Sequence, residues 1–439
     1  MKDEIGVGLI GLGVVGGGVA RALIEREEYF AKQVGARLVL RRAAVRDLAK
    51  PRSVNLRPGI LTDDVQSVVD DPEIDIVVEV IGGEEPAGTY IRAALRAGKH
   101  VVTANKELIA KSGPELLAEA HSHGLDIMFE ASVGGGIPLI APLRRDLMAN
   151  EIRSIRAIIN GTTNYILTSM ANDRTSFAEA LAAAQALGYA EPDPTNDVEG
   201  YDAQYKLAIM ASLGFRTAVR PSDIHVEGIT GLTADDFSSA QEMGYVIKLL
   251  AIAEASEGGV IARVAPAFLP QAAPLAKVDG VYNAVQIDGD LTGVVLLQGR
   301  GAGAEPTSSA VVADLIELAH SVVHRGGAEA PITPYPVTTW YPTERTKQLL
   351  GMSSLESRYF LRLTVKDRPG VLAQIAKTLG DHSVSIAAVN QKEADADAQT
   401  ANLVVMTHRA REGAMQAALA DIRALPVVSE VGSFLRVEA

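Results

Sequence analysis

The sequence contains no cysteine, and this absence narrows the chemistry that the chain can perform. Without cysteine there is no disulfide, no cysteine-ligated zinc and no thiolate nucleophile. Enzymes that oxidise an aldehyde through a covalent thioester are therefore excluded. A reaction that moves a hydride between an alcohol and an aldehyde is compatible with this composition.

Long apolar runs and an excess of positive charge are absent as well. Apolar stretches such as Tyr245–Ser256 are interrupted by charges, here Lys248 and Glu254, so none is long enough to cross a bilayer. The opening residues, MKDEIGVGLIGLG, lack the basic start and the cleavage site of a signal peptide. The formal net charge is −13, whereas binding to nucleic-acid phosphates requires a basic face. We therefore expect a soluble cytoplasmic protein without a membrane or nucleic-acid partner.

The pattern of predicted elements changes along the 439 residues, which exceed one ordinary hydrophobic core. Residues 1–135 alternate strands with helices, which predicts βαβ units in a doubly wound parallel sheet. Residues 136–304 mix long helices with strand-like runs and predict an α+β domain for catalysis and dimerisation. Residues 305–340 are expected to complete the first domain with a helix at Thr307–Val323. The segment from Gly326 to Ser357 is rich in Pro, Thr and Gly and is expected to have limited structure, with a linker at residues 341–357.

Residues 358–439 have the order βαββαβ, which predicts a ferredoxin-like sandwich. The chain is therefore predicted to be an α/β protein with a Rossmann-type first domain. Strands of the first two domains are predicted at Glu4–Ile10, Arg37–Val45, Ile74–Ile81, His100–Thr103, Asp126–Ala131, Ile152–Ile159, Val281–Ile287 and Gly293–Leu297. Helices are predicted at Val14–Gln33, Pro86–Ala97, Pro114–His123, Ser176–Leu187 and Tyr201–Leu213.

A glycine-rich loop follows the first predicted strand and opens a helix, with Gly11, Gly13 and Gly16 spaced as Gly-x-Gly-x-x-Gly. The first glycine permits a tight turn, the second lets the backbone approach a pyrophosphate, and the third lets the helix pack close to the strand. The N-terminus of the helix offers N–H groups and partial positive charge to phosphates. A plain turn also fits the glycines alone, but the strand before and the helix after them indicate a dinucleotide site.

The end of the second predicted strand indicates which dinucleotide is bound. An NAD site usually carries an acidic side chain there, whereas the 2′-phosphate of NADP is met by arginine. The chain has Arg46 followed by Asp47, so NADP is favoured and NAD remains the alternative. Lys50 and Arg52 lie nearby and are equally compatible with solvated loop charges.

Two lysines are candidates for proton transfer. Lys106 comes just after the fourth predicted strand, at the edge where open α/β sheets bind ligands. Lys206 ends a loop-to-helix segment that starts at Gly188 and holds two prolines and several carboxylates. On its helix, Asp202 and Lys206 are four residues apart and share one face. They form either an exposed ion pair or, because Leu207-Ala-Ile-Met is apolar, a buried pair beside a pocket.

Hydride transfer to a carbonyl carbon creates an alkoxide that must be neutralised or protonated. With no zinc site indicated and only 8 histidines, a lysine is the available acid. Glu191 is then a candidate for contacting a substrate ammonium group. Asp193 and Asp197 are equally compatible with a role in orienting the loop.

Motifs along essentially the whole chain resemble those of homoserine dehydrogenases. They are Gly11–Gly16, Ile81-Gly-Gly-Glu-Glu-Pro-Ala, Thr103-Ala-Asn-Lys-Glu, Glu130-Ala-Ser-Val-Gly-Gly-Gly-Ile-Pro, Asn160-Gly-Thr-Thr-Asn-Tyr-Ile-Leu, Gly188–Lys206 and Gly301-Ala-Gly-Ala-Glu-Pro-Thr-Ser-Ser-Ala. The resemblance implies a reversible, NAD(P)H-dependent reduction of L-aspartate 4-semialdehyde to L-homoserine, on the route to threonine and methionine.

The resemblance also implies roles for individual residues. It makes Lys206 the proton donor, has Asp202 hold it, and adds Lys106 to the catalytic set. Cofactor binding is implied for the three glycines of the loop and for Val14, Val15, Arg46, Thr103, Lys106 and Gly303. Substrate binding is implied for Glu191, Tyr189, Asp202, Gly161 and Thr162. Some relatives carry Asp in place of Asn196, which leaves the substrate contact at that position undecided.

A monovalent cation, usually sodium in this family, is implied in the loop that contains four matching residues. It would be bound mainly by backbone carbonyls at Glu130, Val133, Gly135 and Ile137. The alternative is that this Gly-rich segment is only a turn, since cation sites made of carbonyls leave little trace in a sequence.

The tail resembles an ACT domain through Val365-Lys-Asp367-Arg-Pro-Gly370-Val-Leu-Ala-Gln-Ile-Ala. Such domains pair edge to edge and bind small amino acids, so we expect a homodimer or homotetramer that L-threonine inhibits. The helix N-terminus after Gly370 and the side chain of Asn390 are candidate contacts for the amino acid. The alternative is a module that only pairs subunits.

Two other functions share some of these features. A dehydrogenase of another amino or imino acid needs the dinucleotide loop but not the Gly188–Lys206 segment. A non-catalytic sensor of nucleotide and amino acid has no use for the proton donor that Lys106, Asp202 and Lys206 indicate.

Overall fold

The computed structural model describes residues 2–324, 341–391 and 399–438. Internal contacts divide the chain into two compact units. The first comprises Met1–Ile155, Tyr205–Asp223 and Asn283–Lys347. The second comprises Arg156–Gln204, Ile224–Tyr282 and Gln348–Ala439. Strand β7 (Ile152–Ile158) and helix α9 (Tyr201–Phe215) run from one unit into the other.

The first unit is built on a six-stranded sheet in the order β3-β2-β1-β4-β5-β6, and every neighbouring pair is parallel. The strands are β1 (Glu4–Ile10), β2 (Arg37–Ala44), β3 (Leu61–Thr62), β4 (Ile76–Glu79), β5 (His100–Thr103) and β6 (Ile127–Met128). The direction of strand order reverses between β1 and β4, and ligands of such sheets bind at the carboxyl ends beside this point. The predicted Rossmann-type α/β domain is confirmed.

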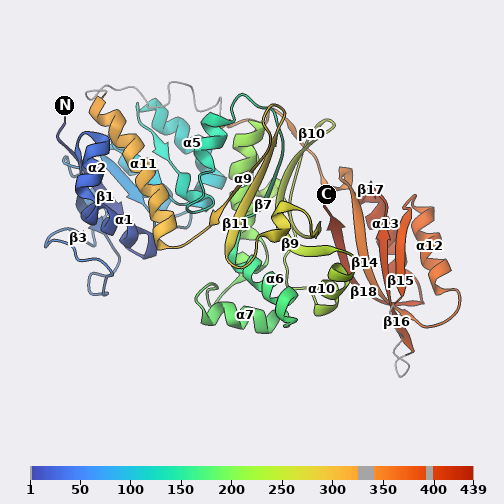
Figure 1. Ribbon diagram of the computed structural model, residues 1–439. Coiled ribbons are helices and arrows are strands. Elements are labelled where there is room, and N and C mark those ends of the chain that lie inside the picture. The colour runs from blue at the N-terminus through green and yellow to red at the C-terminus, as the bar shows by residue number, and fades with distance from the viewer. Residues whose placement is uncertain (1, 325–340, 392–398, 439) are drawn as a thin grey trace. The chain divides into compact units, whose positions relative to one another are not determined.

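Helices cover this sheet and complete its core. They are α1 (Val14–Glu25), α2 (Glu27–Val34), α3 (Gln66–Val69), α4 (Ala87–Arg96), α5 (Lys106–Ser122) and α11 (Ala304–His324). Helix α11 lies beside α1 (Figure 1), and its Val311 and Leu315 share one apolar core with Val7 of β1. The sequence leads us to expect a late helix that completes the first domain, and α11 lies in the core of the first unit. The rest of that expected segment, with Trp340, lies outside the described residues.

The stretch expected to be a linker carries more structure than its composition predicts. Tyr341 is buried, and its hydroxyl donates a hydrogen bond to the carbonyl of Ile109 at 3.0 Å. The backbone N–H groups of Thr346 and Lys347 both donate to the hydroxyl of Thr217, each at 3.0 Å. These contacts depend on distant partners, which a Pro- and Thr-rich composition does not reveal.

The second unit contains a long antiparallel hairpin, β9 (Tyr245–Ser256) and β10 (Gly259–Pro270), which the sequence analysis did not predict as strands. Its residues are buried on both faces, so the run is almost continuously apolar and shows no alternation. Helices α6 (Gly161–Asp173) and α10 (Ala234–Glu242) pack against β9. The unit's other elements outside the C-terminal module are α7 (Phe177–Ala186), α8 (Thr195–Val198), β8 (His225–Val226) and β13 (Gln348–Leu349). Strands β11 (Tyr282–Gly289), apart from its first residue, and β12 (Gly293–Arg300) belong to the first unit.

The C-terminal module has the predicted βαββαβ order, with β14 paired to both β16 and β18. Its elements are β14 (Glu356–Lys366), α12 (Val371–Asp381), β15 (Ile386–Gln391), β16 (Thr400–Thr407), β17 (Ala410–Arg411), α13 (Glu412–Ala424) and β18 (Val428–Val437). Strand β18 also pairs in parallel with β10, so β9, β10, β18, β14, β16 and β15 are consecutive neighbours in one sheet. The module is thus joined to the rest of its unit by backbone pairing.

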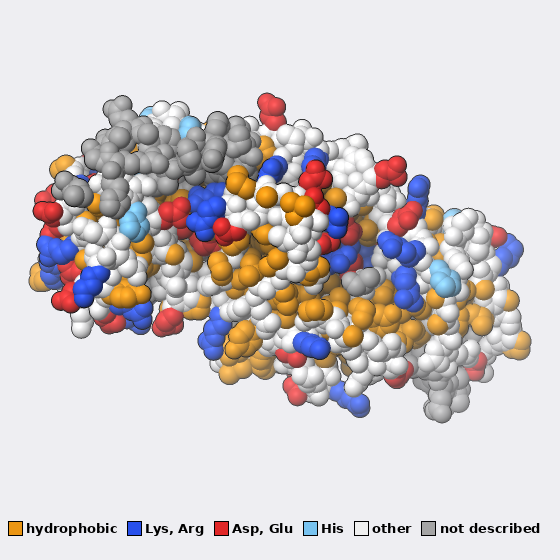
Figure 2. All heavy atoms as spheres, turned by 45° about the horizontal axis from the view of Figure 1, so that its top comes forward, with side chains coloured by type: hydrophobic (Ala, Val, Ile, Leu, Met, Phe, Trp, Pro, Cys, Tyr) orange, Lys and Arg blue, Asp and Glu red, His pale blue; other side chains and the backbone are white. Residues whose placement is uncertain are grey.

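The surface and the helices of the described residues show two general features. No helix among them is long and apolar enough to cross a membrane. On the face drawn in Figure 2, acidic and basic side chains are interspersed rather than gathered into a field of one sign.

Candidate functional site

The glycine loop of the first unit has the backbone geometry of a dinucleotide site. Gly11 has φ +103°, a conformation that favours glycine. A Cβ at Gly16 would lie 2.2 Å from the carbonyl oxygen of Gly11, so only glycine fits there. Nothing lies within 4 Å of a Cβ built at Gly13, which leaves space for a ligand. Gly13 is the N-cap of α1 and supplies no side-chain cap, so this helix end suits an anion.

The loop after β2 places Arg46 on the surface directly beyond the strand. Asp47 instead accepts a hydrogen bond from the N–H of Ala49 at 2.8 Å. Arg52 donates to the carbonyl of Leu12 at 3.1 Å and to the carbonyl of Asp47. Arg52 is therefore not a solvated loop charge, because it ties the loop after β2 to the glycine loop.

The carboxyl ends of β4 and β5 share a buried network. Glu79 is fully buried and accepts hydrogen bonds from the hydroxyl of Thr103 at 2.6 Å and from the N–H of Ile81 at 2.8 Å. The Thr103 hydroxyl also accepts the N–H of Asn105 at 3.0 Å. Asn105 caps α5 through the N–H of Leu108, so the network fixes the turn at which Lys106 begins the helix. The Thr103 side chain is occupied by these structural contacts.

A second polar cluster surrounds Asn160 in the second unit. Asn160 is buried, caps α6, and accepts the N–H of Thr163 at 2.8 Å. Its amide donates to Asp197 at 2.6 Å and to Asp202 at 2.9 Å. Asp202 and Lys206 are themselves buried and four residues apart on α9. The exposed ion pair considered from the sequence is therefore wrong, and Asp202 is held by an amide.

The loop before α9 is tied down at several points, while two of its side chains are exposed. The hydroxyl of Thr162 donates to the carbonyl of Tyr189 at 2.7 Å, and Gly161 is the first residue of the same helix α6. Asp193 accepts hydrogen bonds from Thr195, which lower the pKa of that carboxyl. The side chains of Tyr189 and Glu191 are exposed on this fixed backbone.

The loop that starts at Glu130 concentrates buried negative charge. The Glu130 carboxylate accepts three backbone N–H groups, from Leu139 at 2.6 Å, Ile140 at 2.9 Å and Ala141 at 2.8 Å. Its own N–H donates to Asp314 at 2.9 Å. Burial, together with the charge of Glu130, raises the pKa of the Asp314 carboxyl well above its usual range.

The fit of this loop to a cation can be judged from its donors. The Glu130 side chain is fully engaged, which leaves backbone carbonyls of the residues Val133, Gly135 and Ile137 as ligands. Gly134 and Gly135 have φ of +74° and +56°, and such turns expose carbonyls. No group of three or more His, Asp or Glu residues in the described part of the chain is arranged to hold a metal ion. The donor set therefore fits a weakly bound hard cation better than a transition metal.

Comparison with known proteins identifies the family. Residues 11–130 match the family model "Homoserine dehydrogenase, NAD binding domain", residues 138–316 match "Homoserine dehydrogenase", and residues 359–427 match "ACT domain". A homoserine dehydrogenase of Synechocystis sp. is 44% identical over 397 residues, which is 90% of each chain. The chain belongs to the homoserine dehydrogenase family.

Solved structures of homoserine dehydrogenases agree with this assignment. The one from Thiobacillus denitrificans has a TM-score of 0.92 at 42% identity and covers 100% of this chain and 99% of its own. A hyperthermophilic archaeal homoserine dehydrogenase in complex with NADPH has a TM-score of 0.61 at 28% identity, and covers 72% of this chain and 97% of its own. The enzyme is accordingly an NAD(P)-dependent oxidoreductase with an ACT domain, as the sequence predicted.

Four residues of this homoserine dehydrogenase scaffold have structural roles that the sequence analysis did not assign to them. Glu79 had a visible signal, since it is, with Asp75, one of two carboxylates inside the apolar run Ile74–Ile81. Asn160 had a weaker one, as an asparagine between a strand and a helix is a common N-cap. The roles of Arg52 and Asp314 depend on contacts with residues 40 and 184 positions away, which no local pattern shows.

Proposed function

We propose that the enzyme reversibly reduces L-aspartate 4-semialdehyde to L-homoserine with NADPH, on the route to threonine and methionine. The observation that carries this proposal is the buried cluster in which Asn160 donates to Asp202, on the helix face that also holds buried Lys206. A buried lysine next to a carboxylate is costly to maintain unless it has a partner and a use.

In the proposed reaction Lys206 protonates the carbonyl oxygen of the aldehyde as negative charge develops on it. The bound nicotinamide supplies the hydride that reduces the carbonyl carbon. Asp202 holds Lys206 in the orientation needed for proton transfer, and Asn160 holds Asp202. Lys106, at the start of α5, provides positive charge near the reacting oxygen.

Substrate selection is assigned to the loop between α7 and α9. The exposed Glu191 carboxylate binds the ammonium group of the amino acid, and Tyr189 lies next to it on the same fixed backbone. Gly161 and Thr162 contribute by holding that backbone, because the Thr162 hydroxyl donates to the carbonyl of Tyr189.

The test is the steady-state rate of NADPH oxidation with aspartate semialdehyde. Lys206→Ala should lower kcat by about 10²- to 10⁴-fold, with a much smaller effect on NADPH binding. Lys377→Ala is the matched control, because Lys377 is exposed and pairs with Asp381 four residues away on the same helix. A Lys206→Ala enzyme with near-normal turnover would rule out the assignment.

The preference for NADP is supported by the exposed Arg46 and by the engagement of Asp47 with its own loop. The NADPH complex of the archaeal relative supports the same cofactor. Val14, Val15 and Gly303 are assigned to the nucleotide site together with the glycine loop.

A sodium ion at the carbonyls of the Glu130 loop is supported by the left-handed turn at Gly134 and Gly135, which exposes carbonyls, and by the buried Glu130 carboxylate that holds this loop. Its binding would leave the hydride and proton steps to the residues above and would stabilise the loop. Activity and melting temperature titrated with NaCl against choline chloride test this, and equal curves for both salts would contradict it.

We further propose that L-threonine binds the ACT domain and inhibits the enzyme. Helix α12 begins after Gly370 without a side-chain cap. Asn390 lies on β15, and the next residue, Gln391, donates a hydrogen bond to the carboxylate of Asp367 at 3.5 Å. Inhibition requires that threonine bind a less active arrangement more tightly, typically with about 1–3 kcal/mol of coupling. Asn390→Ala should then weaken inhibition without changing the uninhibited rate. An enzyme that neither binds nor responds to millimolar threonine would make the module a pairing device, in a homodimer or homotetramer.

A further inference from the structure

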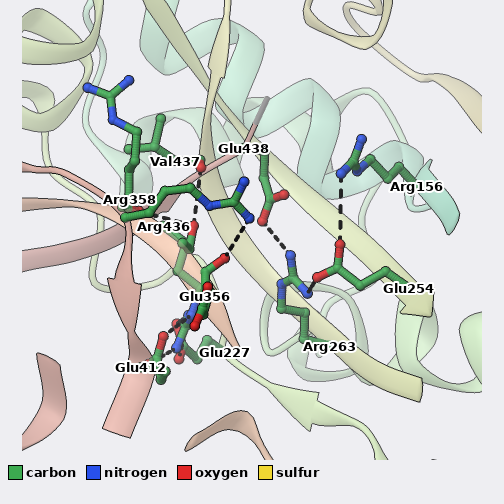
Figure 3. A network of polar contacts seen from close by, with 12 residues as sticks. Arg156, Glu227, Glu254, Arg263, Glu356, Arg358, Glu412, Arg436, Val437 and Glu438 are labelled. Atoms are coloured by element: carbon green, nitrogen blue, oxygen red, sulfur yellow. Dashed lines mark hydrogen bonds and ion pairs between the residues drawn. The ribbon is translucent and has the colours of Figure 1, made fainter. Parts of the chain in front are cut away.

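A row of ion pairs in the second unit connects the end of the chain with strand β7. The guanidinium of Arg263 on β10 contacts Glu438 at 2.6 Å and Glu254 of β9 at 2.6 Å. The second oxygen of Glu254 lies 3.8 Å from the guanidinium of Arg156 on β7. Figure 3 shows this row, from Glu438 through Arg263 and Glu254 to Arg156. We call it the β7 relay.

The first link of the β7 relay is buried and therefore differs from a surface salt bridge. Arg263 is 2% exposed and Glu438 is 6% exposed. Burial alone would lower the pKa of Arg263, but the two carboxylates outweigh it and raise the pKa. Removing one partner of a buried pair leaves a charge without compensation, whereas exposed pairs contribute little. The position of Glu438 therefore matters to Arg263.

Backbone contacts fix Glu438 on β10. Strand β18 pairs with β10 through Arg436 opposite Ala267 and Val437 opposite Phe268. The N–H of Glu438 then donates to the carbonyl of Phe268 at 2.8 Å. A shift of β18 that breaks its pairing with β10 therefore moves the Glu438 carboxylate away from Arg263.

The other end of the β7 relay lies close in sequence to the polar cluster around Asn160. Arg156 precedes Asn160 by four residues on the strand that ends at Ile158. Only three residues separate Arg156 from Asn160, so a displacement of β7 at Arg156 is carried to Asn160 through the backbone. Asn160 is the residue whose amide holds Asp202 at 2.9 Å.

We propose that Glu438 and Arg263 are positioning residues for the catalytic cluster, acting through Glu254 and Arg156 on Asn160. The proposal rests on the proposed function, in which Asp202 orients Lys206. It gives the C-terminal module a physical means to change turnover: a shift of β18 loosens Arg263 from Glu438 and releases β7.

The test is a double-mutant cycle in kcat on the full-length enzyme. Glu438→Gln keeps the shape of the side chain and removes its charge, and should lower kcat about 3- to 10-fold with the KM for NADPH unchanged. Glu356→Gln is the matched control, since Glu356 is in the same module and its carboxylate pairs with exposed Arg411 on the surface. The control should leave kcat unchanged.

The second arm of the cycle is Asn160→Ser, which keeps an N-cap oxygen for α6 but removes the amide donors to Asp202. If Glu438 acts through Asn160, Glu438→Gln should have no further effect on kcat in the Asn160→Ser background. Losses that multiply would show a general weakening of the structure and would overturn the β7 relay. A silent Glu438→Gln would overturn it as well.

Arg156→Gln and Lys206→Ala show whether the relay or the proposed function has failed. Arg156→Gln leaves both partners of Arg263 in place. If Glu438→Gln does not fold, Arg156→Gln must itself show the kcat loss of about 3- to 10-fold and the non-additivity with Asn160→Ser. A normal kcat for Asn160→Ser together with a normal kcat for Lys206→Ala would contradict the proposed function itself. If Asn160→Ser and Lys206→Ala both lower kcat, and Glu438→Gln lowers it further in the Asn160→Ser background, the β7 relay alone is contradicted.

Discussion

Asp236→Ala measures how firmly the C-terminal module is held to the rest of its unit. Asp236 on α10 is fully buried and accepts hydrogen bonds from Arg362 of β14 at 2.8 Å and from Ser433 of β18 at 2.6 Å. It also accepts the N–H of Thr233, the N-cap of α10, at 2.9 Å. One carboxylate therefore joins two strands of the module to a helix outside it.

The expected loss follows from these partners. Removing one member of a buried pair costs about 3–5 kcal/mol, because the other charge stays buried without compensation. Loss of the capping contact adds about 0.5–2 kcal/mol. We therefore expect Asp236→Ala to lower the free energy of unfolding by about 3.5–7 kcal/mol. Asp381→Ala, which removes an exposed i,i+4 pair with Lys377, should cost about 0.5 kcal/mol at most.

The assay is urea unfolding followed by circular dichroism, with the activity measured in parallel. Adding Arg362→Met to Asp236→Ala should recover part of the loss, since the pair is then removed as a whole. The reasoning would be refuted if Asp236→Ala unfolded within about 1 kcal/mol of the parent, a typical surface value. It would also be refuted if the two losses simply added.

Three further predictions concern the cofactor loop and acid stability. Arg46→Ala should weaken NADPH binding by about 10- to 100-fold and leave NADH binding nearly unchanged, as fluorescence titration would show; equal losses would contradict it. Gly16→Ala should abolish binding of both cofactors, because its Cβ would lie 2.2 Å from the Gly11 carbonyl; retained binding in the same titration would contradict the loop geometry. Burial raises the pKa of Glu227, but hydrogen bonds from His225 and Arg436 outweigh it and lower that pKa to about 2. The Glu227 carboxylate therefore stabilises the fold above its ordinary pKa of 4.5, and this stabilisation is lost as the pH falls toward 2. The urea midpoint of the parent should accordingly approach that of Glu227→Gln between pH 4.5 and pH 2.

The sequence predicted the parts of the fold that depend on local pattern. The alternation of strands and helices, the glycine spacing and the βαββαβ order of the tail were all visible, because each repeats a short-range periodicity. The hairpin β9–β10 was missed for the same reason. Its residues are apolar on both faces, so no period distinguishes it from a buried helix.

The candidate site was predictable only where a motif carries its own chemistry. Lys206 and Asp202 follow from their spacing on one helix, and their burial follows from the apolar residues next to them. The partner of Asp202 does not, because Asn160 lies 42 positions away. The same holds for the Asp236–Arg362 pair, whose members are 126 positions apart.

These long-range contacts change how the regulatory module should be tested. Removal of all residues after Gly351 is the obvious way to separate regulation from catalysis. In this chain it would also strip β18 from the edge of β10 and leave Arg263 with one of its two close carboxylates. Asp236 would lose Arg362, and Glu227 would lose Arg436. The loss of activity in a truncated enzyme could therefore be caused by these unpaired buried charges and would say nothing about regulation. Single substitutions such as Glu438→Gln and Asn390→Ala avoid this problem and are the informative experiments.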